Sequence, residues 1–193
     1  IKQACSISAD AHIEAMKSVK DGDSEQFIES MSIHEFSKRG ARYPAYNPIV
    51  AGGENACVLH YVENNQQLNN DDLLLVDAGC EYEMYAADIT RTFPVSGKFS
   101  DEQLAIYKVV LDAMNAAIDM VKPGNHIMQP QEISEKVITE GLVKLGLLDG
   151  DPEELHKSGA YKEFYMHKIG HWLGLDVHDA GDYVEGEEYM KFK

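Results

Sequence analysis

The chain has 193 residues, of which 44% are hydrophobic, and this is enough to bury the core of one domain. Its 17 basic and 33 acidic residues give a net charge of −16, which argues against nucleic acid or an anionic membrane as a partner, because both attract clustered Lys and Arg. Carboxylates also bind hard divalent cations, so composition leaves open whether the acidic groups form a solvated surface or include a metal site.

The cysteine pattern and the N-terminal sequence indicate the cellular compartment. Cys5, Cys57 and Cys80 are odd in number and lack CxxC spacing, so they favour neither a disulfide framework nor a thiolate zinc site. No apolar run has the length of a transmembrane helix, and the N-terminus lacks the features of a signal peptide. We therefore expect a cytoplasmic protein. Because the sequence opens inside a helical pattern without Met, we also expect it to be part of a longer protein.

Two helices are predicted first. The apolar positions predicted to face the core in the opening helix are Cys5, Ala9, Ile13 and Met16. Ser24 is a good N-cap for a second helix that runs toward Arg39. Its predicted apolar face contains Phe27, Ile28 and Met31.

Short strands are predicted next. Residues 46–61 contain brief apolar runs around "GGEN", which is typical of strands joined by a glycine turn. The stretch "DDLLLVDAGCEYEMYAADITRTFPVSG", residues 71–97, predicts a buried strand, a bend containing glycine, and a second strand. Together these form a hairpin or meander.

Helices return after residue 100. Ser100 is expected to cap a long helix that ends at Lys122-Pro123-Gly124. Its predicted apolar face comprises Ile106, Val110, Ala113, Ala117 and Met120. A further helix is expected at about 131–145, then a short one within "LGLLDGDPEEL", and short apolar runs from Tyr161 onward. Helices and strands in separate runs predict the α+β class.

Two aspartates, Asp77 and Asp88, lie 11 residues apart in the predicted hairpin. Asp77 follows a buried strand, where an unpaired carboxylate is costly, so it needs a cation or several donors. It could instead cap the turn before Gly79, and Asp88 could pair with Arg91. If both carboxylates project toward one site, they repel each other unless a metal neutralises them.

Histidines cluster near the C-terminal end of the sequence. The stretch "YMHKIGHWLGLDVHD", residues 165–179, holds His167, His171 and His178. Histidine ligates metals through a neutral ring nitrogen. A histidine combined with the two aspartates would form a mixed carboxylate and imidazole site, suited to Mn, Co, Zn or Fe.

Three blocks of the sequence resemble consecutive blocks of aminopeptidase P, the Xaa-Pro aminopeptidase branch of the pita-bread metallopeptidases. They are "HEFSKRGARYPAYNPIVAGGENACVLHY", "LLLVDAGCEYEMYAADITRTFPVSGKFS" and "FYMHKIGHWLGLDVHDAG", and the collinear match runs from about Ala4 to Tyr183. The resemblance implies a pita-bread fold and two divalent ions, typically Mn. It also implies that Asp77 binds one ion, Asp88 bridges both, and His171 binds the other.

The resemblance implies roles for three further histidines. His60, in "VLHY", and His178 are expected to contact substrate and to act in catalysis, and His167 is expected to contact substrate. Without the resemblance, His60 would be an ordinary half-buried histidine after a strand, and His178 could simply hydrogen-bond Asp179. Four histidines match no functional position and are interpreted as surface or packing residues: His12, His34, His126 and His156.

Two glutamate ligands of the family lie beyond the matched blocks. Glu185, Glu187 and Glu188 do not match them. We therefore expect residues 1–193 to form the catalytic pita-bread domain without its C-terminal part, with the N-terminal domain of the full protein absent. The chain alone is then expected to be inactive.

The predicted function is a metal-dependent aminopeptidase that releases the first residue from peptides with proline at position two. Peptides are the expected partners, and the full protein is expected to be a homo-oligomer. One alternative is prolidase, which shares the hairpin and "VHD" signals but takes dipeptides. Another is a pita-bread module that has lost catalysis and binds peptides or proteins.

Overall fold

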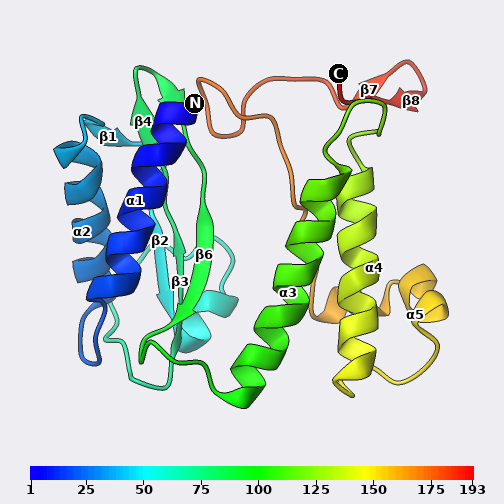
Figure 1. Cartoon of the computed structure of the whole chain (residues 1–193), viewed down its shortest axis with the longest axis horizontal. Helices are drawn as coiled ribbons and strands as arrows, with labels where there is room; N and C mark the ends of the chain where they lie inside the picture. Colours follow the sequence, from blue (N-terminus) through cyan, green and yellow to red (C-terminus); the bar gives the residue numbers. More distant parts are fainter. The chain divides into compact units, whose positions relative to one another are not determined.

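The computed structural model describes residues 1–193, and Figure 1 shows its elements in chain order. The chain divides into two compact units, which are described separately. The first unit contains Ile1–Phe99 and Trp172–Ala180, and the second contains Ser100–His171 and Gly181–Lys193. Helices and short antiparallel strands occur in separate runs, as predicted for the α+β class.

The opening helix, α1 (Lys2–Ser18), buries a different face from the predicted one. Its fully buried positions are Ala4, Ile7, Ser8, Ala11, His12 and Ala15. The predicted face was wrong, since Ile13 and Met16 are 46% and 40% exposed. Short side chains allow α1 to approach α2 and β4 closely, so the face rich in alanine is the one that packs.

Helix α2 (Glu25–Lys38) begins as predicted. The Ser24 hydroxyl accepts a hydrogen bond from the Phe27 amide, which satisfies one of the free amides of the first turn. Ile28 is fully buried, but Phe27 is 49% exposed, contrary to the prediction. The helix packs against α1 and β2 (Ile49–Gly52).

Two three-stranded antiparallel sheets make up the rest of the first unit. In one, β3 (Leu73–Asp77) lies between β2 and β6 (Thr90–Pro94). In the other, β4 (Cys80–Tyr82) lies between β1 (Tyr43–Pro44) and β5 (Tyr85–Ala86). The predicted antiparallel pairing of two strands is confirmed by β3 and β6, but the bend predicted between them contains two further strands, β4 and β5, which belong to the other sheet. The core contains Leu74, Val76 and Phe93 from the strands together with the buried side chains of α1 and α2.

Residues 58–61, predicted to lie in a strand region, are not a strand. They follow the 3₁₀ helix η1 (Gly53–Cys57) and form a turn. The cause is Glu25, which is fully buried at the start of α2. Its carboxylate accepts hydrogen bonds from four donors in this loop: the Gly52 and Gln66 amides, the Asn55 side chain and the Tyr61 hydroxyl.

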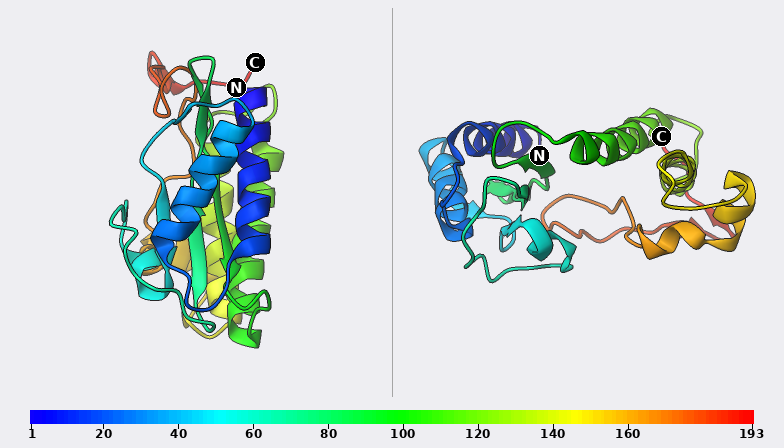
Figure 2. Two further views of the ribbon diagram at one scale, coloured as in Figure 1. Left: turned by 90° about the vertical axis from the view of Figure 1, so that its left-hand side faces the viewer. Right: turned by 90° about the horizontal axis from the view of Figure 1, so that it is seen from below.

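The second unit is built on two antiparallel helices, α3 (Asp101–Met120) and α4 (Gln129–Lys144), which lie side by side (Figures 1 and 2). Ser100 and Gln103 form the predicted capping box. A short helix, α5 (Pro152–Ser158), and a 3₁₀ turn, η2 (Ala160–Glu163), pack on α4. The only strands after Tyr161 are β7 (Val184–Glu185) and β8 (Glu188–Tyr189).

One face of the α3 and α4 pair is open. An apolar groove of about 260 Å³ is lined by residues that include Val110, Met114, Ile118 and Ile169. Of the predicted α3 face, Ala113 and Ala117 are buried, whereas Ile106 and Val110 are 41% and 53% exposed. No helix in the structure is long and apolar enough to cross a membrane.

Candidate metal centre

Asp77 is the last residue of β3, the central strand of its sheet. It is paired with Ile49 of β2 on one side and Thr90 of β6 on the other. The strand alternates, so that Leu74 and Val76 point into the core while Asp77 is only half-buried. The carboxylate therefore stands at the rim of the core.

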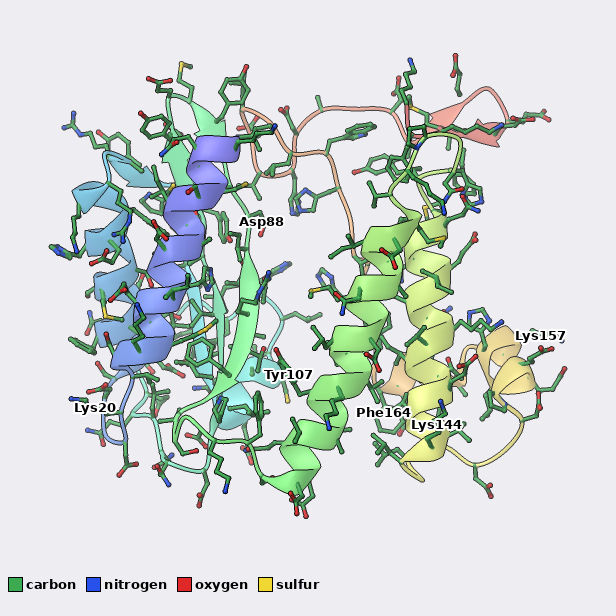
Figure 3. The ribbon with its side chains drawn as sticks, viewed as in Figure 1. Lys20, Asp88, Tyr107, Lys144, Lys157 and Phe164 are labelled. Atoms are coloured by element: carbon green, nitrogen blue, oxygen red, sulfur yellow. The ribbon has the colours of Figure 1, made fainter.

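Gly79 allows Asp88 to reach the same region. A side chain at residue 79 would place its Cβ 1.8 Å from the Ala87 carbonyl oxygen, so only glycine permits this close passage of the backbone. Around it, the Ala78 amide donates to Ile89 O and the Ala87 amide donates to Cys80 O. Asp88 lies in the segment between β5 and β6, where Figure 3 labels it.

The hydroxyl of Tyr46 joins the two carboxylates. It donates to Asp77 Oδ1 at 2.5 Å and lies 3.2 Å from Asp88 Oδ1. The structure thus brings together the two aspartates that the sequence singled out. Sequence reasoning missed Tyr46, although it lies three residues before Ile49, the β-ladder partner of Asp77.

The electrostatics of the pair follow from burial. Burial raises the pKa of Asp77, and the nearby Asp88 charge raises it further, while hydrogen bonds from Tyr46 and Thr90 act in the opposite direction. Burial and the two carboxylates also raise the pKa of the Tyr46 hydroxyl far above its ordinary value, which keeps it a hydrogen-bond donor. The centre is therefore a site with excess negative charge, which a cation would relieve.

His178 reaches this centre from the segment Trp172–Ala180. The Ala86 amide of β5 donates to Gly174 O at 2.8 Å, which attaches the segment to the edge of the strand. Asp179 closes the loop by accepting hydrogen bonds from the Leu175 and Ala180 amides. Ligand atoms of Asp88 and His178 then lie within 4.8 Å of one another.

The remaining predicted histidines occupy exposed loops. His60 lies in the loop held by Glu25 and has a left-handed backbone with φ of 55°. His167 belongs to the second unit, where its Nδ1 is 2.6 Å from Lys168 O. His171 is the last residue of that unit before the chain passes to Trp172.

Comparison with known proteins identifies the family. The model of metallopeptidase family M24 matches residues 1–193. The chain belongs to metallopeptidase family M24. Within this family it is 53% identical over 188 residues to the Xaa-Pro aminopeptidase of Haemophilus influenzae, which covers 97% of the chain and 44% of the relative. It is 48% identical over 183 residues to that of Escherichia coli, covering 95% of the chain and 42% of the relative.

Solved M24 structures share the fold. The structure of the Pseudomonas aeruginosa aminopeptidase PepP superposes with a TM-score of 0.97 at 52% identity, covering 99% of this chain and 43% of that one. A zinc-substituted E. coli aminopeptidase P in complex with product gives 0.91 at 48% identity, covering 93% and 41%. The resemblance to aminopeptidase P and its pita-bread fold is confirmed, and this M24 chain spans less than half the length of these relatives.

Proposed function

We propose that the protein containing this chain is a dinuclear metal-dependent aminopeptidase that releases the first residue of peptides with proline at position two. The observation that carries the proposal is the centre itself: Tyr46 joins Asp77 and Asp88, and His178 lies within reach of Asp88. Relatives named Xaa-Pro aminopeptidases at 48% and 53% identity support the same substrate class. We prefer this to prolidase and to a module without catalysis.

The donor set fits divalent metal ions. Two carboxylates held close together repel each other, and the neighbouring Asp88 charge contributes to the raised pKa of Asp77, so a bound cation would relieve this repulsion. We assign Asp77, Asp88 and His171 as metal ligands and manganese as the metal, with cobalt, zinc or iron as substitutes. Bound divalent ions would supply an activated water near neutral pH and would polarise the scissile carbonyl.

The histidines that are not assigned as metal ligands, His60, His167 and His178, would contact the peptide substrate. A proline bond has no N–H, so recognition needs a pocket shaped for the ring rather than strand pairing. We assign His60 and His178 to donate hydrogen bonds to the carbonyl as negative charge develops, and His167 to bind the substrate. The loop held by Glu25 would set the place of His60.

The proposal treats residues 1–193 as part of the catalytic domain. Two glutamate ligands would come from sequence outside this chain, which alone would then be inactive. The N-terminal domain and the homo-oligomer are likewise proposals. A cytoplasmic location rests on the cysteine pattern.

The experiment uses protein expressed from the complete reading frame and loaded with manganese. We expect release of the first residue from Xaa-Pro-Xaa peptides, with tripeptides preferred to Xaa-Pro dipeptides, and loss of turnover in Asp88→Ala. The exposed Asp149→Ala variant is the control and should keep full activity. A strict dipeptidase profile would assign the protein to prolidase, and the absence of metal-dependent cleavage would favour the binding module.

A further inference from the structure

Helix α1 turns two buried polar side chains toward the backbone that follows Asp77. Ser8 and His12 lie one helical turn apart, and their exposed fractions are 0% and 3%. Buried polar groups are costly unless they make hydrogen bonds, so their partners indicate why they are there. Both partners lie in residues 78–80, directly after the proposed ligand.

Ser8 holds the start of β4. Its hydroxyl accepts a hydrogen bond from the Cys80 amide at 3.0 Å and donates to the Ala4 carbonyl of its own helix at 2.9 Å. The Cys80 thiol donates to the same carbonyl at 3.4 Å. One turn of α1 thus fixes both the backbone and the side chain of Cys80.

His12 holds the residue next to Asp77. Its Nε2 lies 3.0 Å from the Ala78 carbonyl oxygen, and because a carbonyl only accepts, Nε2 carries the proton. Burial lowers the pKa of His12, although the backbone carbonyls of Ala78 and Ile89 oppose this shift, and burial therefore favours the neutral ring. His12 Nδ1 is then a buried acceptor without a hydrogen-bond partner. An aliphatic side chain would avoid that cost, so packing alone does not explain a histidine here.

We propose that Ser8 and His12 are positioning residues for the Asp77 carboxylate. By fixing Ala78 and Cys80 on either side of Gly79, they hold the bend that directs Asp77 toward Tyr46 and Asp88. The inference rests on the proposed function in so far as Asp77 binds metal. The histidine is thus more than the packing residue expected from sequence.

The chain provides a matched control for Ser8. Ser32 on α2 is 2% exposed and donates to the Ile28 carbonyl of its own helix at 2.9 Å. Ser8→Ala and Ser32→Ala therefore remove the same atom from equally buried helix positions, but only Ser8→Ala removes an acceptor of the strand that follows Asp77. For His12, the His12→Gln variant keeps a donor of similar reach, whereas His12→Leu keeps only the volume.

The experiment measures manganese affinity by calorimetry and amide hydrogen exchange without metal, in protein from the complete reading frame. We expect Ser8→Ala and His12→Leu to weaken manganese binding about 10- to 100-fold, the range for groups that orient a metal ligand. His12→Gln should recover most of the loss, and Ser32→Ala should bind as wild type does. The Cys80 amide should exchange roughly tenfold faster in Ser8→Ala alone, because it loses its acceptor.

Each result either supports or overturns the assignment of Ser8 and His12 as positioning residues. Equal manganese affinities for Ser8→Ala and Ser32→Ala, or no recovery in His12→Gln, would overturn the assignment. If His12→Leu fails to fold, the comparison of Ser8→Ala with Ser32→Ala tests the assignment without it. If wild-type protein binds no manganese, the proposed function fails, and the exchange rates alone decide whether α1 holds the bend: faster exchange at Cys80 only in Ser8→Ala supports it, and unchanged exchange overturns it.

Discussion

At the scale of single residues, the Tyr46 hydroxyl is what makes two adjacent carboxylates tolerable. It donates to Asp77 and lies 3.2 Å from an Asp88 oxygen, in a position where burial keeps it protonated. A hydrogen bond to a charged group contributes about 1.5–3 kcal/mol. Tyr46 therefore partly screens the repulsion between the carboxylates before any cation arrives.

We expect Tyr46→Phe to raise the pKa of Asp77 further, because the variant loses a hydrogen bond that lowers it. Metal binding would then require a higher pH, and manganese affinity measured by calorimetry at pH 6 should fall more than at pH 8. Tyr161→Phe, which removes a hydroxyl from a buried tyrosine of the second unit, is the control. Equal losses at the two pH values would contradict the role of the hydroxyl.

Asp77 should also make the metal-free protein less stable as pH rises. Its folded pKa is above the ordinary value of 3.8, so the folded state binds the proton more tightly than the unfolded state does. The free energy of unfolding therefore falls as pH increases from 3.8 through the raised pKa. Because Glu35 and Glu102 have lowered pKa values and act in the opposite direction, the test is the difference: urea denaturation across this range should show that the stability of wild type relative to Asp77→Asn falls as pH rises. Excess manganese should reverse the trend, since the metal binds the ionised form.

The histidines should separate by role when each is changed to Ala in the protein expressed from the complete reading frame. His171→Ala should lose metal and turnover together. His178→Ala and His60→Ala should keep metal and lose about 10²–10³-fold in kcat, and His167→Ala should mainly raise KM. Metal analysis beside steady-state kinetics tests this. Because His178 lies within 4.8 Å of an Asp88 oxygen, loss of metal in His178→Ala alone would make it the ligand.

At the scale of elements, the loop from Trp172 to Ala180 depends on one glycine. A Cβ at Gly174 would lie 1.9 Å from Asp179 Oδ2, the atom that accepts the Leu175 amide. The loop carries His178, so a shift of Asp179 would move a proposed catalytic group.

Gly174→Ala should therefore lower kcat/KM by at least about tenfold, because small displacements of a catalytic group have large effects on rate. Gly170→Ala is the matched control, since a Cβ there meets nothing within 4 Å. Kinetics of both variants, with melting temperatures to check folding, make the comparison. Equal activities would show that the loop adapts without cost.

Local sequence patterns predicted where the helices begin better than they predicted which helix faces are buried or how the loops fold. Ser24 and Ser100 cap their helices as expected, because capping depends on neighbours in sequence. The prediction of the buried face of α1 was wrong, because that face is determined by packing: its alanines let α2 and β4 approach closely. The loop of His60 is shaped by Glu25, whose partners lie 27–41 residues away, and no local pattern reports such a contact.

At the scale of the whole molecule, the site was predictable only in part. Asp77 was found as a carboxylate after a buried strand and Asp88 as a second carboxylate in the same predicted hairpin, whereas Tyr46, Gly174 and Asp179 were not singled out. The centre joins segments that are distant in sequence, so the resemblance to aminopeptidase P supplied what spacing could not. That resemblance and the α+β fold are confirmed by the comparisons.

If ligands are missing from this chain, it should bind manganese weakly by itself. We expect the residual affinity to depend on the aspartate pair, so Asp88→Ala should abolish it. Calorimetric titration of the 193-residue chain, wild type and variant, checks this. Equal binding by the two would contradict the assignment of Asp88.

The open groove on α3 and α4 has a consequence for how the chain behaves in solution. Val110, Met114 and Ile118 are 53%, 37% and 59% exposed there, on a molecule whose net charge is −16. Electrostatic repulsion between like-charged molecules is screened by salt, with a Debye length of about 10 Å at 0.1 M salt and about 3 Å at 1 M. At high salt concentration the apolar grooves of two molecules should therefore be able to come into contact. We expect the chain to self-associate at about 1 M salt and to associate less in dilute buffer.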